Sequence, residues 1–342
     1  MTAVLGMSLL ASPASAAESY PELTAESLAA SDFTLYFANA GATVVDSVAA
    51  GDHMGLYQTV TDQPYGPDAA TGQSWGFVVD GTSNPVARDS TGNEKLASLR
   101  YDSEPSGATL SSRQVTYSFD LPAGTYDVTF GFAAPSSWGG RQVVTMAEGA
   151  ALEAPFSAGT TALEKNYPAV VVNDGTLDLA VASPADRTSG GADPLVNYIL
   201  VRAVPEWTTG LLEAKIGLAT LTDDEAAGYA QDSVASLRSV LADAQALVEA
   251  GATDASAIEA AYLAISAAWD ALRPVVTYDS FRPGEPWLDT DGQVIQAHGG
   301  QVVAATDDQG SAIWYWYGED RSNGYYNSPG VHVYSSYDLY NW

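Results

Sequence analysis

The sequence has no cysteine and few basic residues, with 13 lysines and arginines against 42 aspartates and glutamates. Without cysteine there can be no disulfide, no thiolate nucleophile and no cysteine-ligated zinc. The formal charge of −29 would repel nucleic-acid phosphates and anionic lipid head groups, so we expect no nucleic-acid partner. We interpret the acidity as a solvated surface rather than as a specific binding site.

Long apolar runs are also missing, and no stretch beyond the N-terminus is long enough to predict a membrane span. Residues 1–17 combine a short apolar run with the small residues Ala14, Ser15 and Ala16, spaced as a signal-peptidase site requires. The positively charged start of a signal peptide is absent, so we expect residues 1–17 to be part of one. The predicted protein is therefore secreted, extracellular, soluble and monomeric.

A chain of 342 residues with 46% apolar positions has material for two or three domains. Across residues 30–205, short alternating runs are separated by Gly, Pro, Asn and Asp, which predicts an all-β, jelly-roll-like sandwich. The stretch QVTYSFDLPAGTYDVTFGFAAP predicts a hairpin with one apolar side. That side would carry Val115, Tyr117 and Phe119 on one strand and Tyr126, Val128, Phe130 and Phe132 on the other. NDGTLDLAVAS and LVNYILVRAV each predict one further strand.

Four segments of this region, LYFANAG, SLRYDSE, YSFDLPAGTYDVTFGFA and DPLVNYILVRAV, resemble malectin-like and galactose-binding-like carbohydrate modules. The resemblance implies a polysaccharide or oligosaccharide partner, held by an aromatic ring stacked on a sugar while polar side chains bind the hydroxyls. Aromatic residues in turn-rich stretches are the candidates, with ordinary core packing as the alternative for each: Tyr57, Tyr65, Trp75, Tyr101 and Trp138. We select Tyr65, Tyr101 and Trp138, with Arg141, as the carbohydrate-binding residues.

Residues 206–274 are rich in alanine and predict a three-helix bundle whose first helix covers 209–221. Two apolar stripes mark the other helices: Val234, Leu237, Leu241, Ala244 and Val248, then Ile258, Tyr262, Ile265, Trp269 and Leu272. Gly251 should end the second helix, Thr253 and Asp254 should cap the third, and Pro274 should close the segment. The segment resembles a FIVAR-type module, which implies a spacer or interaction role, with a ligand on an exposed face as the alternative.

Residues 277–342 predict a loop followed by three antiparallel strands at 301–305, 313–317 and 331–335. Both faces of the middle strand are apolar, so we expect the sheet to be covered on both sides. Asp289, Thr290, Asp291 and Gly292 could suggest a calcium loop. The glycine comes two positions early for an EF-hand and no glutamate follows at the twelfth position, so no cofactor or metal is predicted and structural calcium has no supporting ligand set.

The succession DTDGQVIQAHGG, WYWYGED and GVHVYSSYDLYNW resembles the first blade of a five-bladed β-propeller of glycoside hydrolase family 43, in the galactan 1,3-β-galactosidase branch. The resemblance implies an exo-acting, inverting hydrolase in which His298, Trp316 and Glu319 line a substrate pocket. Most of the family has an Asp-Pro pair where this chain has Ala297 and His298, which leaves the catalytic base unassigned. The general acid would lie beyond Trp342, so we expect this incomplete propeller to be inactive. Without the resemblance, His298 would be a turn residue and Glu319 an ordinary acid at a strand end.

Two hypotheses follow. In the first, the chain is the front part of a secreted glycosidase acting on galactan or a related plant cell-wall polysaccharide, and alone it binds carbohydrate. In the second, it is a non-catalytic extracellular carbohydrate-binding or adhesion protein.

Overall fold

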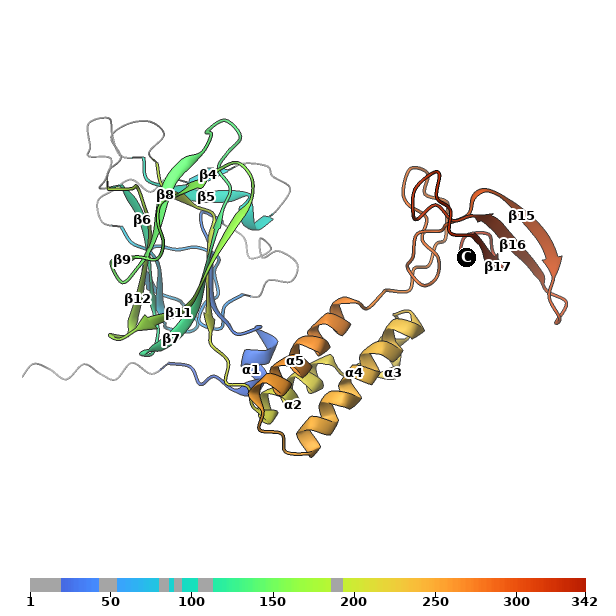
Figure 1. Ribbon diagram of the computed structural model, residues 1–342, viewed down its shortest axis with the longest axis horizontal. Helices are drawn as coiled ribbons and strands as arrows, with labels where there is room; N and C mark the ends of the chain where they lie inside the picture. The colour runs from blue at the N-terminus through green and yellow to red at the C-terminus, as the bar shows by residue number, and fades with distance from the viewer. Residues whose placement is uncertain (1–19, 43–53, 80–85, 89–93, 104–112, 186–192) are drawn as a thin grey trace, which may run out of the picture. The chain divides into compact units, whose positions relative to one another are not determined.

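The computed structural model of the chain describes residues 20–42, 54–79, 86–88, 94–103, 113–185 and 193–342. The predicted signal peptide at 1–17 lies outside these ranges. The chain forms two compact units, Met1–Pro205 and Glu206–Trp342, and consists mostly of antiparallel β-sheet with a few helices (Figure 1). Among the described helices, none combines the length and apolar character that crossing a lipid bilayer requires.

Most of the regular secondary structure described in the first unit is β-strand. Its elements are α1 Ala25–Ala30, β1 Thr34–Asn39, β2 Gly66–Pro67, β3 Ser74–Phe77, β4 Val86–Arg88, the 3-10 turn η2 Glu94–Leu96, β5 Ser98–Tyr101, β6 Gln114–Asp120, β7 Gly124–Phe132, β8 Arg141–Ala147, β9 Ala150–Ala151, β10 Phe156–Ala158, β11 Leu163–Val172, β12 Thr176–Ala182, β13 Leu195–Val196 and β14 Tyr198–Ala203.

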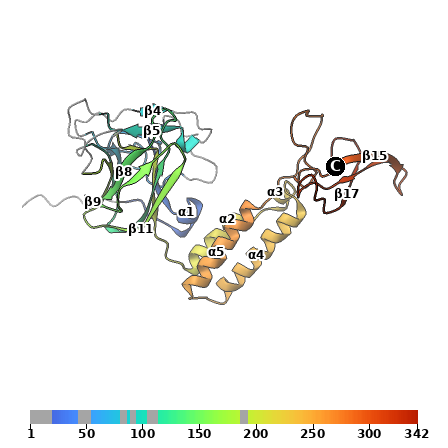
Figure 2. The same ribbon diagram turned by 45° about the horizontal axis from the view of Figure 1, so that its top comes forward.

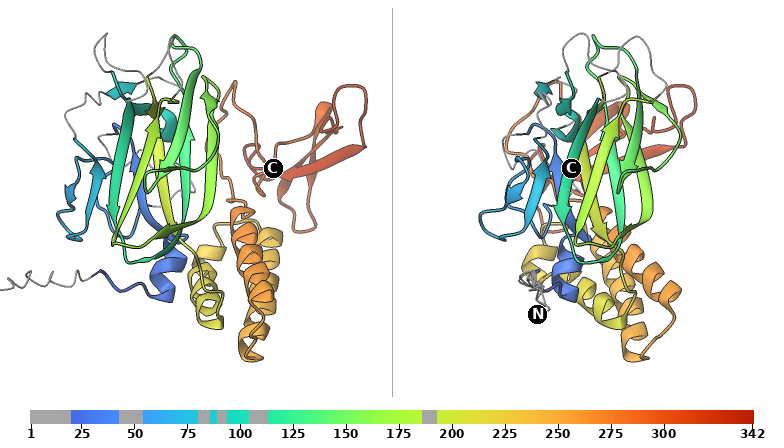
Figure 3. Two further views of the ribbon diagram at one scale, coloured as in Figure 1. Left: turned by 60° about the vertical axis from the view of Figure 1, so that its left-hand side comes forward. Right: turned by 90° about the vertical axis from the view of Figure 1, so that its left-hand side faces the viewer.

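Two antiparallel sheets face each other in this unit (Figure 3). One has the order β1-β14-β7-β11, and the other has the order β10-β8-β12-β6-β3-β2 with β9 beside β8. Alternate residues of the strands point inward and form one apolar cluster, which includes Phe119 of β6, Phe130 of β7 and Leu179 of β12. Burying one such side chain contributes roughly 1.5–3 kcal/mol, so this cluster is the main source of stability. A smaller sheet, β13-β5-β4, lies beside them.

Strands β6 and β7 do not form the predicted hairpin. β6 pairs with β3 and β12, whereas β7 pairs with β11 and β14, so the two strands belong to opposite sheets. The chain crosses between the sheets just after β6, where the Leu121 N–H donates to the carbonyl of Gly175 and the Pro122 carbonyl accepts from the Tyr126 hydroxyl. The alternation of apolar and polar residues shows which side chains are buried. It does not show whether two strands pair in one sheet or lie in opposite sheets.

The stretch LVNYILVRAV is two strands rather than one, because the chain leaves the small sheet at Asn197. Asn197 is fully buried, and its side-chain amide is hydrogen-bonded through both of its polar atoms. The amide nitrogen donates to the carbonyls of Leu96 (3.0 Å) and Ser98 (2.9 Å). Its amide oxygen accepts from the backbone N–H of Ala133 at 2.6 Å. This one side chain therefore ties the small sheet to the end of β7.

The second unit contains helices and a separate small sheet: α2 Thr209–Ala219, α3 Asp223–Ala226, α4 Gln231–Glu249, α5 Ala255–Asp270, β15 His298–Thr306, β16 Ala312–Glu319 and β17 Val331–Ser336. Helices α2, α4 and α5 lie side by side and contact one another (Figure 2).

The local signals at the helix ends are confirmed. The Asp254 carboxylate caps α5 by accepting from the Ser256 N–H at 3.0 Å, and Gly251 follows α4 with a φ of +62°. Tyr262 is buried against Trp207, as its stripe predicts, but Trp269 is 39% exposed and the prediction that it is buried is wrong. Helical periodicity shows which face of a helix carries a residue, but it does not show whether a neighbouring element extends far enough to cover that residue.

The sheet β15-β16-β17 confirms the three predicted strands, each with slightly longer ends. On one face, Trp314, Trp316 and Tyr334 pack with Ile295, Ala297 and Trp342 in an apolar cluster. On the other face, Val303, Tyr317 and Val333 are exposed. Within the described residues, the expected cover is therefore present on one side of the sheet only.

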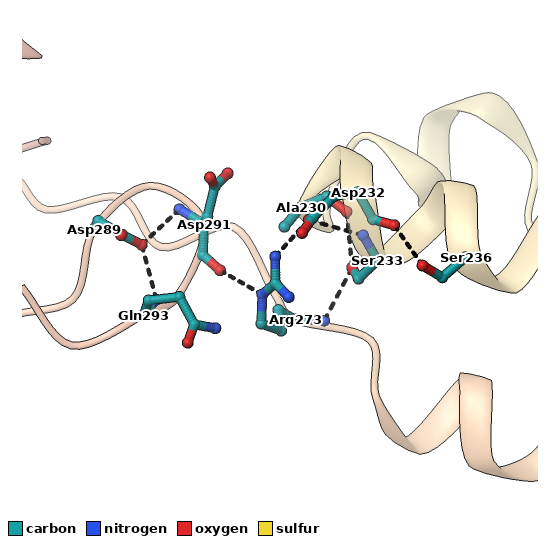
Figure 4. Close-up of polar contacts among 8 residues, drawn as sticks. All are labelled: Ala230, Asp232, Ser233, Ser236, Arg273, Asp289, Asp291 and Gln293. Atoms are coloured by element: carbon teal, nitrogen blue, oxygen red, sulfur yellow. Dashed lines mark hydrogen bonds and ion pairs between the residues drawn. The ribbon is translucent and has the colours of Figure 1, made fainter. Parts of the chain in front are cut away.

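Arg273 links three segments of the second unit (Figure 4). Its guanidinium pairs with the carboxylate of Asp232 in α4 and donates from Nε to the carbonyl of Asp291 at 3.1 Å. The Asp289 carboxylate accepts from the backbone N–H of Asp291 (3.0 Å) and of Gln293 (2.8 Å). The loop that could suggest calcium binding therefore uses Asp289 to hold its own backbone.

Candidate functional site

Arg100 and Tyr101 are neighbours in β5, so they point to opposite faces of the small sheet β13-β5-β4. Tyr101 contacts an aromatic cluster, and Arg100 contacts a buried carboxylate at an open cleft. One face of β5 thus carries the aromatic cluster, and the other face carries the ion pair at the cleft.

The aromatic cluster brings together Tyr101, Trp138 and Arg141, three of the four residues predicted for this unit. The Tyr101 and Trp138 rings meet edge to face, with centroids 4.7 Å apart and planes at 74°. The Arg141 guanidinium lies 5.2 Å above the Trp138 ring and donates to the Trp138 carbonyl. All three side chains are half-buried, so each has packing on one side and solvent on the other.

Local structure explains why Trp138 is presented at the surface. It lies in the connection between β7 and β8, where its N–H closes a turn onto the Pro135 carbonyl at 2.9 Å. Gly139 follows with a φ of +66°, a conformation that glycine adopts without strain. Ser136 and Ser137 beside it are exposed, so the ring is bordered by small polar residues.

This arrangement has the chemistry of a small neutral-ligand site. An indole face offers a flat apolar surface, and the guanidinium supplies hydrogen-bond donors next to it. The Nε atom of Arg141 is buried and has no hydrogen-bond partner among the described residues. A buried donor without a partner is costly, but an atom that solvent cannot reach is also closed to a ligand oxygen.

Tyr65, the fourth predicted residue, lies elsewhere. Its ring is 42% exposed, and its hydroxyl donates to the carboxylate of Asp120 at 2.6 Å. The sheet register places Asp120 at the far end of β6 from Gln114, whereas Arg141 begins β8 at the Gln114 end. The structure therefore separates Tyr65 from the aromatic cluster.

Tyr57 and Trp75, also considered as loop aromatics, are buried in the core with 1% and 0% of their surface exposed. Trp75 lies in β3 and stacks on Phe119, with ring centroids 6.4 Å apart. For these two candidates the alternative, ordinary core packing, is confirmed, because nearby glycines and prolines do not distinguish a loop from a short strand.

Sequence reasoning missed the cleft on the other face of β5. It has a volume of about 620 Å³ and is lined by Gly41, Ala42, Asp62, Gln63, Pro64, Phe77, Val86 and Arg100. The Asp62 carboxylate, 2% exposed, accepts from Arg100 Nε (2.8 Å), the Gly41 N–H (2.6 Å) and the Tyr117 hydroxyl (3.0 Å). No sequence pattern joins two residues 38 positions apart, so nothing signalled this pair.

The electrostatics of Asp62 show a carboxylate used for structure. Burial raises the pKa of Asp62, while the charge of Arg100 and the hydrogen bonds to the carboxylate oppose this rise. Burial, together with the charge of Asp62, raises the pKa of Tyr117 well above its ordinary value, so its hydroxyl remains a donor. Arg100 also covers the Phe77 ring at 3.5 Å, and the Gln63 amide donates to the carbonyls of Gly66 and Trp75. The polar groups of the cleft mainly hold one another.

Asp68 organises the segment that carries Asp62. Its carboxylate accepts from the backbone N–H groups of Thr59 (2.6 Å), Ala70 (3.0 Å) and Thr71 (3.2 Å). Burial raises the pKa of Asp68, but these N–H donors outweigh it and hold the pKa below its ordinary value of 3.8.

This pKa shift predicts acid lability. The stabilisation by Asp68 is complete above pH 3.8 and is lost as the pH falls through the lowered pKa of the folded state. Asp68→Asn should lower the urea midpoint at pH 6 and flatten its decline below pH 4. Equal slopes for the variant and the wild type between pH 4 and pH 2 would contradict this assignment.

In the second unit, His298 and Glu319 are direct cross-strand partners of β15 and β16. His298 is exposed, and Arg321 holds the Glu319 carboxylate with bonds of 2.9 and 2.8 Å. Trp316 does not join them, since it packs between Trp287 and Trp342 with centroids 5.6 and 5.4 Å away. The structure thus brings two of the three predicted residues together.

Two glycines allow the backbone to close around His298. A Cβ on Gly300 would lie 1.7 Å from the Tyr317 carbonyl oxygen, and one on Gly318 would lie 2.1 Å from the backbone of Ala297. Asp320 and His332, which sequence reasoning missed, pair nearby at 2.9 Å. Across the described ranges, no group of three or more His, Cys, Asp or Glu side chains could hold a metal ion.

Comparison with known proteins gives weak likenesses only. No protein-family model matches the chain, and no curated protein matches it. A β-glucuronidase from Bacteroides uniformis aligns with 50% of this chain at 19% identity and a TM-score of 0.34, and the match covers 18% of that enzyme. The ANX2 ectodomain from Arabidopsis thaliana aligns with 50% of the chain at 12% identity and a TM-score of 0.36, covering half of that ectodomain.

A carbohydrate-binding module, CBM36 in complex with calcium and xylotriose, aligns with 35% of the chain at 15% identity and a TM-score of 0.24, covering 89% of that module. TM-scores this low do not assign this chain to the fold or the activity of any of these proteins.

Proposed function

We propose that the first unit binds carbohydrate at the cluster of Tyr101, Trp138 and Arg141. The observation that carries this proposal is the half-buried Trp138 ring, fixed by the edge of Tyr101 and by the Arg141 guanidinium. Side chains from β5, β8 and the loop before β8 converge on it, although they are far apart in the sequence.

The ligand that fits these groups is a neutral pyranose of a polysaccharide or oligosaccharide. The apolar C–H face of the sugar ring would lie on the exposed part of the indole, and Arg141 would donate to a ring or hydroxyl oxygen. A ring fixed before binding loses little conformational freedom on binding, which favours affinity from a small contact.

We further propose that the chain belongs to a secreted glycosidase acting on galactan or a related polysaccharide. The proposal comprises a jelly-roll-like sandwich, a FIVAR-like three-helix bundle and a propeller blade of family 43 type, with boundaries 30–205, 206–274 and 277–342. The motifs at 289–342 support it, as does the cross-strand position of His298 and Glu319. The alternative is a non-catalytic adhesion protein that uses the same binding cluster.

Trp138→Ala tests the binding site. We expect it to weaken binding of the full chain to its best glycan in a panel of galactans and plant cell-wall polysaccharides by about tenfold, measured by affinity electrophoresis, because the stacking surface is lost. Trp269→Ala is the matched control, since it removes an exposed tryptophan from the other unit and should leave binding unchanged. Circular dichroism should show that both variants fold. If no glycan in the panel retards the wild-type chain, or if Trp138→Ala binds as wild type does, the proposal is wrong.

A further inference from the structure

Two adjacent tyrosines in the second unit are unusually exposed. Tyr326 is 96% exposed and Tyr325 is 65% exposed, in the loop between β16 and β17. A tyrosine ring normally buries much of its apolar area, and exposed aromatic side chains in a loop are a common feature of binding surfaces. Within the described residues, the apolar cluster of this sheet does not cover the Tyr326 ring.

The loop that carries these tyrosines is pinned at its base. Asp320 is buried, and its carboxylate accepts from the Ser322 N–H at 2.8 Å and pairs with His332 at 2.9 Å. The Asp320 N–H donates to the Gly330 carbonyl, which closes the loop end to end at 2.9 Å. Gly324 turns the chain just before the tyrosines with a φ of +93°. The rings are therefore presented on a pinned loop, which lowers the entropic cost of binding.

The two rings have different surroundings. The Arg321 guanidinium lies 4.1 Å from the centre of the Tyr325 ring, and Glu319 in turn holds Arg321 with two hydrogen bonds. The Tyr325 and Tyr326 rings meet at 75° with centroids 4.9 Å apart. One ring is thus supported by a fixed cation, and the other supplies an open apolar face beside it.

The chemistry around the rings favours a sugar. Residues 322–330 are exposed, and apart from the two tyrosines they are serine, asparagine, glycine and proline, without a charge. The Glu319 carboxylate pairs with Arg321 and the Asp320 carboxylate pairs with His332, so the acidic groups nearest the loop already have partners. Two rings with a polar border are also far smaller than the ~800 Å² that each partner buries in a stable protein interface.

We propose that Tyr326, supported by Tyr325 and Arg321, is a second contact for a neutral glycan. A pyranose would stack on the open face of Tyr326, while the asparagines and serines of the loop reach its hydroxyls. This contact lies in the second unit and does not depend on the cluster around Trp138.

The test uses the full chain and the same glycan panel. Tyr326→Ala should weaken binding roughly threefold to tenfold, both in the wild-type background and in the Trp138→Ala background. Tyr326→Phe should retain affinity, because the ring face and not the hydroxyl makes the contact. Tyr337→Ala is the matched control, since that tyrosine is 62% exposed just after the end of β17 and should not affect binding.

The two proposals fail in different ways. Unchanged affinity for Tyr326→Ala in both backgrounds overturns this one, whatever Trp138→Ala does. An equal loss from Tyr337→Ala also overturns it, because the effect would then not be specific to the loop. If Tyr326→Ala weakens binding and Trp138→Ala does not, the second contact stands and the first is wrong. If the panel contains no glycan that the full chain binds, both are overturned.

Discussion

Asp62→Ala is expected to lower the free energy of unfolding of the first unit by about 3–5 kcal/mol, because it removes the buried carboxylate that pairs with the guanidinium of Arg100. The same change removes the acceptor of the Gly41 N–H and of the Tyr117 hydroxyl. A typical domain is stable by only about 5–15 kcal/mol, so this loss would be a large fraction of the total. Urea unfolding followed by near-UV circular dichroism measures it.

A double-mutant cycle separates the ion pair from the remaining contacts. Arg100→Met alone should also be strongly destabilising, whereas the double variant should cost much less than the sum of the two single changes. Glu22→Ala is the control, because that carboxylate is exposed and should shift stability by no more than about 0.5 kcal/mol. Additive losses, or a loss below about 1 kcal/mol for Asp62→Ala, would show that the pair does not hold the segments together.

The parts of the fold that depend on local signals could be predicted from the sequence. Asp254 and Gly251 mark helix ends because a carboxylate can accept from the first turn and glycine can adopt a positive φ. The three strands of the second unit were predicted because short runs rich in β-branched and aromatic residues lie between turn residues. In each case the cause lies within a few residues of the effect.

The parts that depend on distant contacts could not be predicted. Alternation marked the buried faces of β6 and β7 correctly, but nothing local states that one pairs with β12 and the other with β14. Asp62 and Arg100 lie 38 positions apart with β2, β3 and β4 between them, and neither stands out in sequence. The two residues become neighbours only when the unit has folded.

The residues of the candidate site could be predicted in part from the sequence. Turn-rich surroundings identified Trp138 and Tyr101, and in the structure the Trp138 ring contacts both Tyr101 and Arg141. The same criterion also made Trp75 a candidate, although it is buried, because glycines and prolines border short strands as well as loops. Composition could therefore suggest which aromatic residues reach the surface, but only packing could decide among them.

Asn197→Ala is expected to cost about 2–4 kcal/mol, because it removes three buried hydrogen bonds and leaves one N–H and two carbonyls without that partner. Asn197 joins the small sheet to β7, and Tyr101 stands at the end of that sheet, paired with Leu195. Loss of these hydrogen bonds should therefore also let Tyr101 move away from Trp138. We expect glycan affinity to fall together with stability, although none of these three hydrogen bonds involves Tyr101, Trp138 or Arg141.

Asn166→Ala is the control for this prediction, because Asn166 is exposed and makes one surface hydrogen bond with Thr129. Its effect on the urea midpoint should correspond to no more than about 0.5 kcal/mol. Asn197→Asp separates the two functions of the amide, since it keeps an acceptor for the Ala133 N–H but loses the donors to Leu96 and Ser98. It should be at least as destabilising as alanine, because it buries a charge facing two carbonyl oxygens. If both Asn197 variants unfold at the wild-type urea midpoint, the small sheet is held by its apolar packing alone and the amide has no such role.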